Sequence, residues 1–338
     1  MLKEDFITKL KQSGLTGRGG AGFPTWQKWQ AIQDASGNKK YIICNASEGE
    51  PFVLKDKYIL ENYPQELIQG IKIALSTILH SQAIIYLNST YYQLFKTTLE
   101  KLIISSPIIL FQESAGYLGG EETTLLNVIE GKRLEPRIKP PFPTESGLWG
   151  QPTLINNVET FYWVAKIAQN QYTNKRFYCI FGDANHQGTF ELPNDYSLKQ
   201  ILKETNNYPD FPFFLQVGGG ASGSIIMPNE LDQPLSGAGS IIIFNKETTN
   251  ILDLMKGWAE FFLRENCDQC VPCREGVYHI NEILQAKLKK PSTASKATSS
   301  LLDPTLLKDI LTSLAKTSFC PLGKGVAIPF TTALRKLF

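Results

Sequence analysis

Four cysteines in this sequence have the spacing of an iron–sulfur site. Cys267, Cys270 and Cys273 form a C-x2-C-x2-C run, and a fourth cysteine, Cys320, precedes a proline. Four thiolates are the usual ligand set of a [4Fe–4S] cluster. Zinc is the competing assignment, although zinc sites more often pair two C-x2-C knuckles. The spacing therefore favours a cluster held by a compact triplet and one remote cysteine, which makes the chain an electron carrier.

A glycine-rich segment near the N-terminus is suited to binding an anion. Four glycines fall within the six positions of Gly17–Gly22, and Lys28 follows them. Glycine lets the backbone approach a ligand and point N–H groups at it. The segment is not a dinucleotide fingerprint, because no strand precedes it, and it is not a P-loop, because no Gly-Lys-Ser/Thr follows. A flexible linker is the alternative, but Arg18, Phe23 and Trp29 are unlike linker residues.

Three further stretches place polar or aromatic side chains where a ligand could bind. The first follows a predicted strand, the second opens a helix expected to run to Gly131, and the third is rich in proline. Each also has an ordinary interpretation, such as a solvated acidic turn or a pair of carboxylates that favour a helix N-terminus. In chain order, the stretches are Asn45–Pro51, Gly119–Thr123, and Lys139–Pro143 with the later pair Asn156 and Asn157.

The first half of the chain predicts a parallel α/β sheet that would position these residues. Strands are expected at 41–45, 83–87 and 108–111, with helices at 64–79 and 91–103 between them. This β-α-β-α-β order is typical of a parallel sheet. Ligands of such sheets bind just beyond the carboxyl ends of the strands. The polar residues after the first strand and the glycines after the third are therefore the expected site.

The second half predicts a small α+β module followed by a helical region. A β-grasp arrangement suits the module, and the low-complexity stretch 291–300 is expected to be a mobile loop between Cys273 and Cys320. The expected strands are 177–181, 188–192 and 213–217, and the expected helices are 197–204, 252–265 and 306–315.

Composition limits the class of protein. The chain has 338 residues, enough for two or three domains, and its formal charge of +2 gives no reason to expect nucleic acid as a partner. The N-terminus is unlike a signal peptide. The apolar region 71–87 is interrupted by polar residues, which predicts a buried helix and strand instead of a membrane span. Cys44 and Cys179 have no disulfide-like spacing, which favours a reducing compartment. We therefore expect a cytoplasmic protein that reaches a membrane only through partner subunits.

Taken together and in this order, the motifs resemble those of a known family, the NADH- and FMN-binding [4Fe–4S] subunits of respiratory complex I. The same family includes the flavin subunits of NAD-linked hydrogenases and formate dehydrogenases. The resemblance runs from Gly14 to the end of the chain. The matching segments are Gly17–Lys28, Asn45–Pro51, Lys55 with Asp56, Gly120–Asn127, Glu130–Arg133, Pro136–Pro143, Gly147–Thr160 and the four cysteines.

The resemblance implies three domains of known kind. They are a Rossmann-like α/β domain for FMN and NADH at residues 1–172, a ubiquitin-like β-grasp module of the SLBB type at 173–248, and a helical bundle with a [4Fe–4S] cluster at 249–338. The implied activity is oxidation of NADH by hydride transfer to FMN. Single electrons would then pass to the cluster and on to partners, typically a thioredoxin-like [2Fe–2S] subunit and a multi-cluster iron–sulfur subunit.

The resemblance also assigns site residues by position. Glu50 and Glu122 take the catalytic positions, and both also belong to the NADH side with Phe23, Lys139 and Phe142. The cysteines Cys267, Cys270, Cys273 and Cys320 would hold the cluster. The FMN positions are Gly17, Arg18, Gly19, Gly20, Lys28, Asn45, Glu48, Gly120, Glu121, Asn156 and Asn157.

Some positions depart from the family pattern. Ser47 stands where the family usually has an acidic residue in the flavin pocket, Ala31 stands where an aromatic helps to stack the nucleotide, and Gly119 replaces a cysteine. The β-grasp module is expected to be shortened between Gly220 and Gly239. Losing one stacking ring weakens the grip on adenine. A non-catalytic electron-transfer or scaffold subunit that has lost nucleotide binding is therefore the alternative function.

Overall fold

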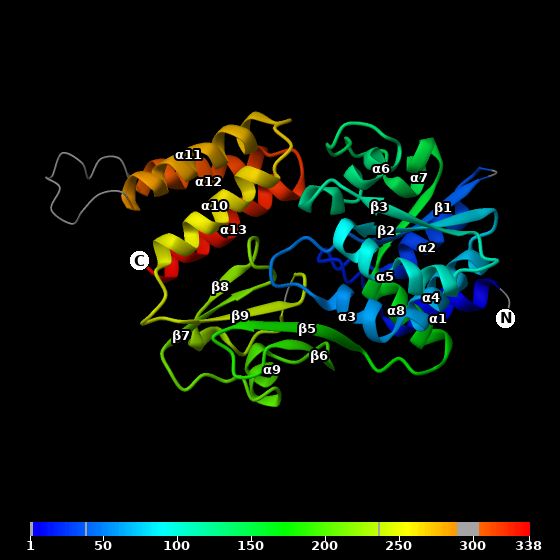
Figure 1. Cartoon of the computed structure of the whole chain (residues 1–338), viewed down its shortest axis with the longest axis horizontal. Helices are drawn as coiled ribbons and strands as arrows, with labels where there is room; N and C mark the ends of the chain where they lie inside the picture. Colours follow the sequence, from blue (N-terminus) through cyan, green and yellow to red (C-terminus); the bar gives the residue numbers. More distant parts are fainter. Residues whose placement is uncertain (1–2, 38, 236, 289–303) are drawn as a thin grey trace, which may run out of the picture.

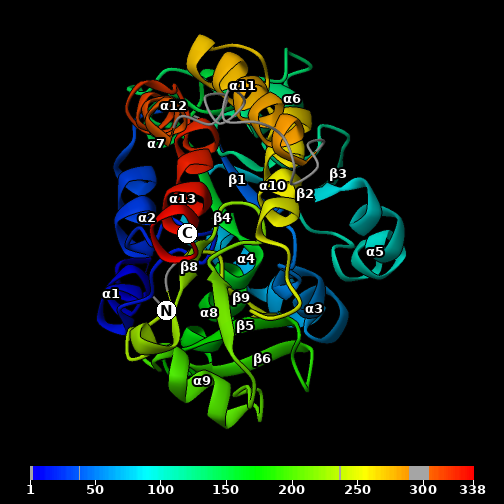
Figure 2. The ribbon, with the colours of Figure 1, turned by 90° about the vertical axis from the view of Figure 1, so that its left-hand side faces the viewer.

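The computed structural model describes residues 3–37, 39–235, 237–288 and 304–338. The elements form an α/β unit, a second sheet with one helix, and a bundle of helices (Figure 1). Figure 2 shows the bundle and the second sheet lying one above the other in a view turned by 90°. The stretch 291–300, expected as a mobile loop, lies outside the described residues.

The α/β unit is built on a four-stranded parallel sheet in the order β3-β2-β1-β4. The three predicted strands and both predicted helices are confirmed, and β4 is an additional strand that the sequence analysis did not predict. The strands are β1 (Lys40–Ala46), β2 (Ser81–Asn88), β3 (Ile108–Glu113) and β4 (Thr153–Asn157), and the longer helices are α1 (Lys3–Ser13), α2 (Thr25–Asp34), α3 (Lys55–Asn62), α4 (Pro64–Thr77), α5 (Ser89–Leu102) and α8 (Val158–Ala168).

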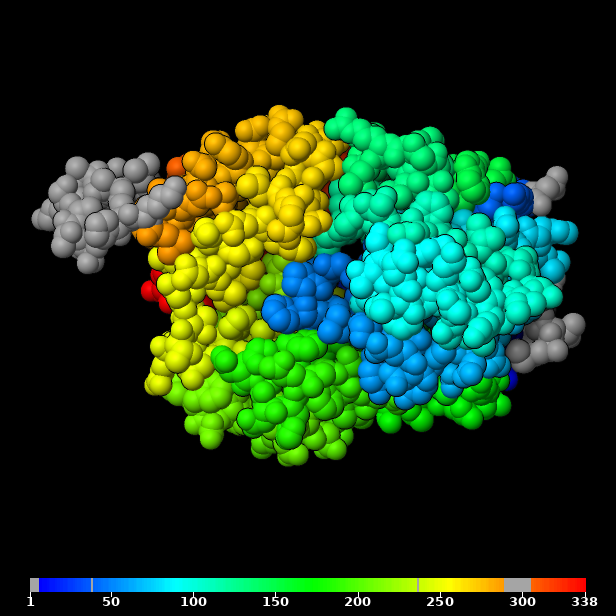
Figure 3. Space-filling model, viewed as in Figure 1, coloured from blue at the N-terminus to red at the C-terminus, as the bar shows by residue number. Residues whose placement is uncertain are grey.

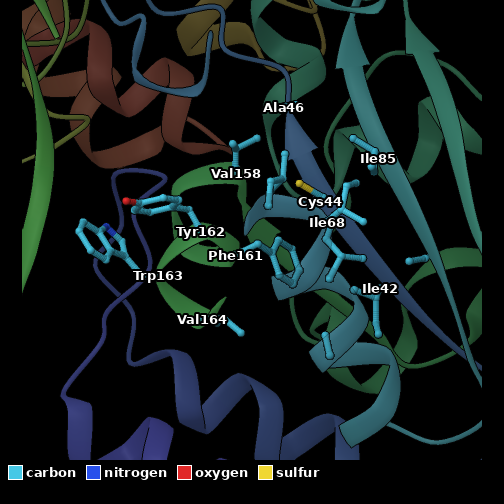
Figure 4. Packing of buried hydrophobic residues seen from close by; sticks show 14 of the residues in the cluster. Ile42, Cys44, Ala46, Ile68, Ile85, Val158, Phe161, Tyr162, Trp163 and Val164 are labelled. Atoms are coloured by element: carbon cyan, nitrogen blue, oxygen red, sulfur yellow. The ribbon is translucent and has the colours of Figure 1, made fainter. Parts of the chain in front are cut away.

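Helices cover both faces of this sheet, and its central strands β1 and β2 are buried along most of their length. Ile42 and Cys44 of β1 point into a core with α4 and α8, and Figure 4 shows Ile42 packed near Phe161 of α8. A Cβ atom at Gly70 of α4 would overlap the carbonyl oxygen of Phe161, so glycine permits this close helix packing. Ile43 faces the opposite side, towards the short helix α6 (Thr124–Ile129).

The segment between β3 and β4 is less helical than expected. The prediction of one helix from Gly119 to Gly131 is wrong. The chain first makes a 3-10 turn, the α-helix runs only from Thr124 to Ile129, and the chain turns again at Gly131, where φ is 69°. The short elements are η1 (Tyr117–Gly120), α6, α7 (Pro143–Ser146) and η2 (Leu148–Gly150), followed later by η3 (Pro228–Glu230).

The second sheet has five strands in the order β6-β5-β9-β7-β8. β5 and β9 are parallel neighbours at its centre, and the other pairs are antiparallel, which is the predicted β-grasp arrangement. Ser197 and Gln200 form a capping box that starts the crossover helix. The elements are β5 (Lys175–Gly182), β6 (Gly188–Pro193), α9 (Leu198–Glu204), β7 (Phe213–Val217), β8 (Ser224–Ile226) and β9 (Ser240–Asn245).

The last described part is a bundle of helices around an apolar core that includes Trp258 and Phe330. Two of its helices, α10 (Ile251–Glu265) and α12 (Pro304–Thr317), were predicted, whereas α11 (Val271–Leu288) and α13 (Pro321–Lys336) were not. The bundle docks on the edge strand β8. Ile225 of that strand donates its N–H to Thr332 of α13 and accepts a hydrogen bond from Lys336. Within the described residues, no helix has both the length and the apolar character needed to cross a membrane.

Candidate functional site

Cys267, Cys270, Cys273 and Cys320 line one cavity of the helical bundle. All four are free thiols; Cys273 and Cys320 are buried, and the other two are partly exposed. Among the residues that the structure describes, no three His, Cys, Asp or Glu side chains lie close enough to share a single metal ion. Leu118 of η1 also lines the cavity, so the α/β unit contributes to its wall.

Local backbone geometry brings the remote cysteine to the triplet. Cys320 is the last residue before α13, whose first turn packs against the start of α11. A Cβ atom at Gly323 would lie 2.7 Å from the Ser318 side chain and 3.2 Å from Cys273 Cβ. Glycine at this position therefore allows the two helix starts to approach. Within the triplet, Asp268 adopts a left-handed turn with φ of 57°.

The chemistry of this cavity suits cationic iron. Burial raises the pKa of Cys273 to about 12, and the neighbouring cysteines act in the same direction. Burial also raises the pKa of Cys267 and of Cys320, although the N–H groups of Leu322 and Gly323 favour the Cys320 thiolate. Crowded, partly desolvated thiols bind as thiolates only when positive charge compensates them. The donor set therefore fits an iron–sulfur cluster.

The glycine-rich segment forms a loop whose two ends are joined. Gly17 N–H donates to Phe23 O at 2.8 Å, which closes the loop. Gly20 and Gly22 have φ of 109° and 65°, and a Cβ atom at either position would meet no described atom within 4 Å. One side of the loop is therefore open to a ligand. Arg18 is 4% exposed and anchors the loop, because its guanidinium donates to the side-chain oxygen of Asn194, the residue after β6.

Asparagines from two strands lie at the carboxyl edge of the parallel sheet. β1 and β4 pair in a register that sets Asn45 opposite Asn157 and Cys44 opposite Asn156. Asn45 donates to Gly120 O at 2.8 Å, and Asn156 accepts a hydrogen bond from the buried Trp29 of α2 at 3.0 Å. The structure thus brings predicted site residues from separate motifs to one edge.

Four of the predicted residues form an ion cluster beside this edge. Lys28 lies 3.1 Å from Glu122, and Lys139 lies 3.0 Å from Glu122 and 3.3 Å from Glu121. Burial alone would raise the pKa of Glu122, but the two lysines outweigh it and lower that pKa. The Phe23 ring lies 5.9 Å from the Lys28 ammonium.

Two aromatic rings near this cluster are available for stacking. Phe23 is 46% exposed and Phe142 is 52% exposed, although large apolar side chains usually bury more of their surface. Ala31 is exposed on α2, the helix that carries Lys28. A planar ligand would therefore find two ring faces here.

Glu121 and Glu48 are held by backbone N–H groups. The Glu121 carboxylate accepts from the N–H groups of Thr123 and Thr124 and so caps α6. Glu48 accepts from the first N–H groups of α3 and from the hydroxyl of Tyr91. Burial raises the pKa of Glu48 to about 8, and the negative charge of Asp56 contributes to this rise. Glu48 thus fixes the turn after β1 to α3.

The structure adds site residues to which the sequence analysis gave no role. Lys55 lies 2.5 Å from Asp56 and 2.9 Å from the side-chain oxygen of Asn157, and both charged residues are buried. Ser47 stands where the family usually has an acidic residue. Its hydroxyl donates to the buried carboxylate of Glu113, at the end of β3, at 2.7 Å. A carboxylate therefore still lies at this edge. Nothing local in the sequence marks Glu113, because only the β2–β3 pairing carries it there.

Glu50 contacts other elements. Its carboxylate accepts from Tyr117 Oη at 2.6 Å and from the N–H groups of Ala221 and Ser222 in the second sheet's β7–β8 connection. Figure 3 shows the segment that follows β1, in blue, at the surface between the α/β unit, the second sheet and the bundle. The structure thus divides the predicted residues between the sheet edge with its ion cluster, the Glu50 contacts and the cysteine cavity.

Two sequence models of known protein families match separate parts of the chain. The sequence model of the "Nuo51 FMN-binding domain" matches residues 10–166, and that of the "NADH-ubiquinone oxidoreductase-F iron-sulfur binding region" matches residues 253–337. The fold and the matches thus define a flavin-binding and iron–sulfur-binding class of protein.

Relatives that match almost the whole chain show to which family within this class the protein belongs. The F subunit of NADH-quinone oxidoreductase from Streptomyces coelicolor is 34% identical over 99% of this chain and 82% of its own length. The F 2 subunit of the same enzyme from Rhizobium meliloti is 31% identical over 98% of this chain and 86% of its own. The chain belongs to the family of NADH-quinone oxidoreductase F subunits, and the predicted resemblance is confirmed.

A solved structure shares the fold. A chain of an NAD+-reducing [NiFe]-hydrogenase in the H2-reduced state superposes with a TM-score of 0.90 at 28% sequence identity, over 99% of this chain. The present chain spans 62% of that hydrogenase chain.

Proposed function

We propose that this chain is an NADH-oxidising electron-input subunit that binds FMN and one [4Fe–4S] cluster. The observation that carries this proposal is the short turn η1. Leu118 of that turn lines the cysteine cavity, and two residues further Gly120 accepts the Asn45 amide at the sheet edge. One turn of backbone therefore joins the proposed flavin site to the proposed cluster site. Electron transfer between the two groups requires that they lie close together.

The sheet edge and the glycine-rich loop would hold FMN. The open loop and the Lys28 ammonium suit a phosphate, and the asparagine amides suit the polar edge of a planar ring. Bound FMN supplies the chemistry, because it accepts a hydride and gives electrons up singly. The residues proposed for it are Gly17, Arg18, Gly19, Gly20, Lys28, Asn45, Glu48, Gly120, Glu121, Asn156 and Asn157.

The ion cluster and the exposed rings would bind NADH. Phe23 and Phe142 offer faces for stacking, and Lys139 offers positive charge to the pyrophosphate. Glu122, held between two lysines, can accept a hydrogen bond from a ribose hydroxyl. Glu50 and Glu122 touch the nucleotide in this proposal and orient it. Neither needs to take a proton, because the protein's part in flavin chemistry is orientation and exclusion of water.

The four cysteines would hold the cluster, and electrons would leave through partner proteins. The relatives are named as subunits, which supports a partner requirement. By the family resemblance, the proposed partners are a thioredoxin-like [2Fe–2S] subunit and a multi-cluster iron–sulfur subunit. We place the chain in the cytoplasm and divide it at 1–172, 173–248 and 249–338.

Cofactor content and NADH oxidation test the proposal. The purified chain, reconstituted anaerobically with FMN, iron and sulfide, is expected to be yellow-brown with one flavin and about four irons per chain. It is also expected to reduce ferricyanide with NADH. A colourless product would contradict the cofactor assignment. Full cofactor loading without oxidation of NADH or NADPH would favour a non-catalytic subunit.

A further inference from the structure

The Glu50 carboxylate is held by the β-grasp module. The connection between β7 and β8, Gly218–Gly223, approaches the turn after β1 and donates two backbone N–H groups to one Glu50 oxygen. These bonds come from Ala221 at 2.8 Å and Ser222 at 2.9 Å. The approach is tight, since Gly220 N–H also donates to Pro51 O at 3.0 Å. The module is thus in direct contact with a residue that we assign to the nucleotide site.

Glycine is required for this contact. A Cβ atom at Gly219 would overlap the Glu50 oxygen that accepts the two N–H groups. A Cβ atom at Gly220 would lie 2.6 Å from Pro51 O. The sequence of this connection therefore lets the backbone reach the carboxylate, where any side chain would push it away.

Tyr117 holds the second oxygen of the same carboxylate. Its hydroxyl donates to Glu50 at 2.6 Å, and its N–H donates to Glu265 of α10 at 3.0 Å. Its ring lies 5.0 Å from the Phe261 ring of the same helix. Tyr117 is thereby fixed to the bundle while it reaches Glu50. Elements of all three parts of the fold meet around this carboxylate.

We infer that the Gly218–Gly223 connection and Tyr117 position Glu50 for a nicotinamide dinucleotide. This inference rests on the proposed function and extends it to a module outside the flavin domain. A free glutamate side chain loses rotamer freedom when a ligand fixes it, and that loss weakens binding. Three donors remove this cost, because they hold the carboxylate before the nucleotide arrives.

A matched pair of glycine variants tests the inference. Gly219→Ala introduces a methyl group against the Glu50 carboxylate, at a backbone φ of 156°. Gly188→Ala lies in the same module at a φ of 150°, and no described atom lies within 4 Å of its added methyl. Both variants carry similar backbone strain, so their difference reports the overlap of the added methyl group with the Glu50 carboxylate and with Ser222 Oγ, which would lie 2.8 Å away.

The readouts are the dissociation constant for NAD+ by calorimetry, and kcat and KM for NADH with ferricyanide, each at checked flavin content. Gly219→Ala is expected to weaken NAD+ binding and raise KM by about two- to tenfold, the effect of freeing one side chain. Its kcat should change less than about twofold, because the flavin site is untouched. Gly188→Ala should match the wild type.

Tyr117→Phe gives an independent test, because it removes only the hydroxyl that reaches Glu50. It should weaken NAD+ binding in the same way. Tyr178→Phe is its control, since that buried hydroxyl donates to Pro193 O at 2.8 Å inside the β-grasp module. In a Glu50→Ala background, Gly219→Ala and Tyr117→Phe should add almost nothing, because coupled residues are not additive.

The outcomes separate the two proposals. If the wild type binds NAD+ and oxidises NADH, but Gly219→Ala and Tyr117→Phe leave affinity and KM unchanged, the inference is wrong and the proposed function stands. Equal effects with and without the Glu50 carboxylate would also overturn it. If the fully loaded wild type neither binds NAD+ nor oxidises NADH, the proposed function fails and the inference fails with it.

Discussion

The cluster cavity depends on one close contact, which Gly323→Ala would disturb. The added methyl group would lie 2.7 Å from the Ser318 side chain and 3.2 Å from Cys273 Cβ. The first turn of α13 would have to move away from Ser318 and from Cys273 of α11, and this movement would shift Cys320. Gly325→Ala is the matched control in the same helix, because its nearest neighbour, Ser222 Cβ, lies 4.0 Å away.

Comparing Gly323→Ala with Gly325→Ala separates two effects on stability, the gain in helix propensity and the cost of steric overlap. Replacing a helical glycine by alanine stabilises by about 1 kcal/mol at either position. Overpacking a tight interior site costs about 1–3 kcal/mol. The difference between the variants cancels the propensity gain, so Gly323→Ala should be about 1–3 kcal/mol less stable than Gly325→Ala. Gly325→Ala should equal or exceed the wild type.

Cluster stability is the appropriate assay, because a chain of several domains does not unfold in two states. Iron and sulfide content report assembly, and loss of the visible cluster absorbance in urea reports the stability of the bundle. Gly323→Ala should bind less iron and lose its cluster at lower urea, with flavin content unchanged. Four irons and a wild-type urea midpoint in Gly323→Ala would show that the α11–α13 contact does not set the cysteine cavity.

Three further predictions follow from the site. Cys320→Ala should leave flavin reduction by NADH intact while impairing cluster assembly, and a normal four-iron cluster in this variant would contradict the ligand assignment. Phe142→Ala should raise KM for NADH about fivefold to tenfold with FMN still bound, whereas Ala31→Phe should lower it, because each stacking contact contributes on the order of 1 kcal/mol; an unchanged KM in Phe142→Ala would place the nucleotide elsewhere. Glu122→Gln should lower thermal stability at neutral pH. The pKa of Glu122 is lower in the folded protein than its ordinary value of 4.5, so the ionised carboxylate stabilises the fold fully above pH 4.5. This stabilisation is lost as the pH falls through the pKa of the folded state. Melting curves at pH 7 and pH 3 check this, and an equal deficit at both values would contradict it.

Local sequence patterns predicted most of the fold. Apolar runs such as Tyr41–Asn45 predicted buried strands, and their alternation with helices predicted the parallel sheet. Strand β4 was missed because its sequence ends in two asparagines, which strands disfavour, and its pairing with β1 is a long-range contact. Helices α11 and α13 were missed because prolines and glycines fall inside them, including Pro329, and packing overrides the weak local propensity.

The site was predicted only where a motif carries several residues at once. The cysteine spacing identified the residues of the cavity, and the run Gly120–Glu122 led to the ion cluster. Glu113 and Tyr117 were not identified, because a lone carboxylate or tyrosine has no local signal. Their roles arise from tertiary contacts with Ser47 and Glu50, and such contacts cannot be derived from the spacing along the chain.

The docking of α13 on β8 covers an edge strand that could otherwise pair with another chain. An edge strand offers unpaired N–H and C=O groups, and another chain can pair with them. On β8, the Thr332 and Lys336 side chains occupy both groups of Ile225 at 2.9 Å and 2.7 Å. The last turns of α13, the helix that follows Cys320, thus cover the edge of the β-grasp sheet at Ile225. Detachment of this helix would expose an unpaired edge strand as well as the cysteine cavity. Loss of iron and aggregation are therefore expected to occur together.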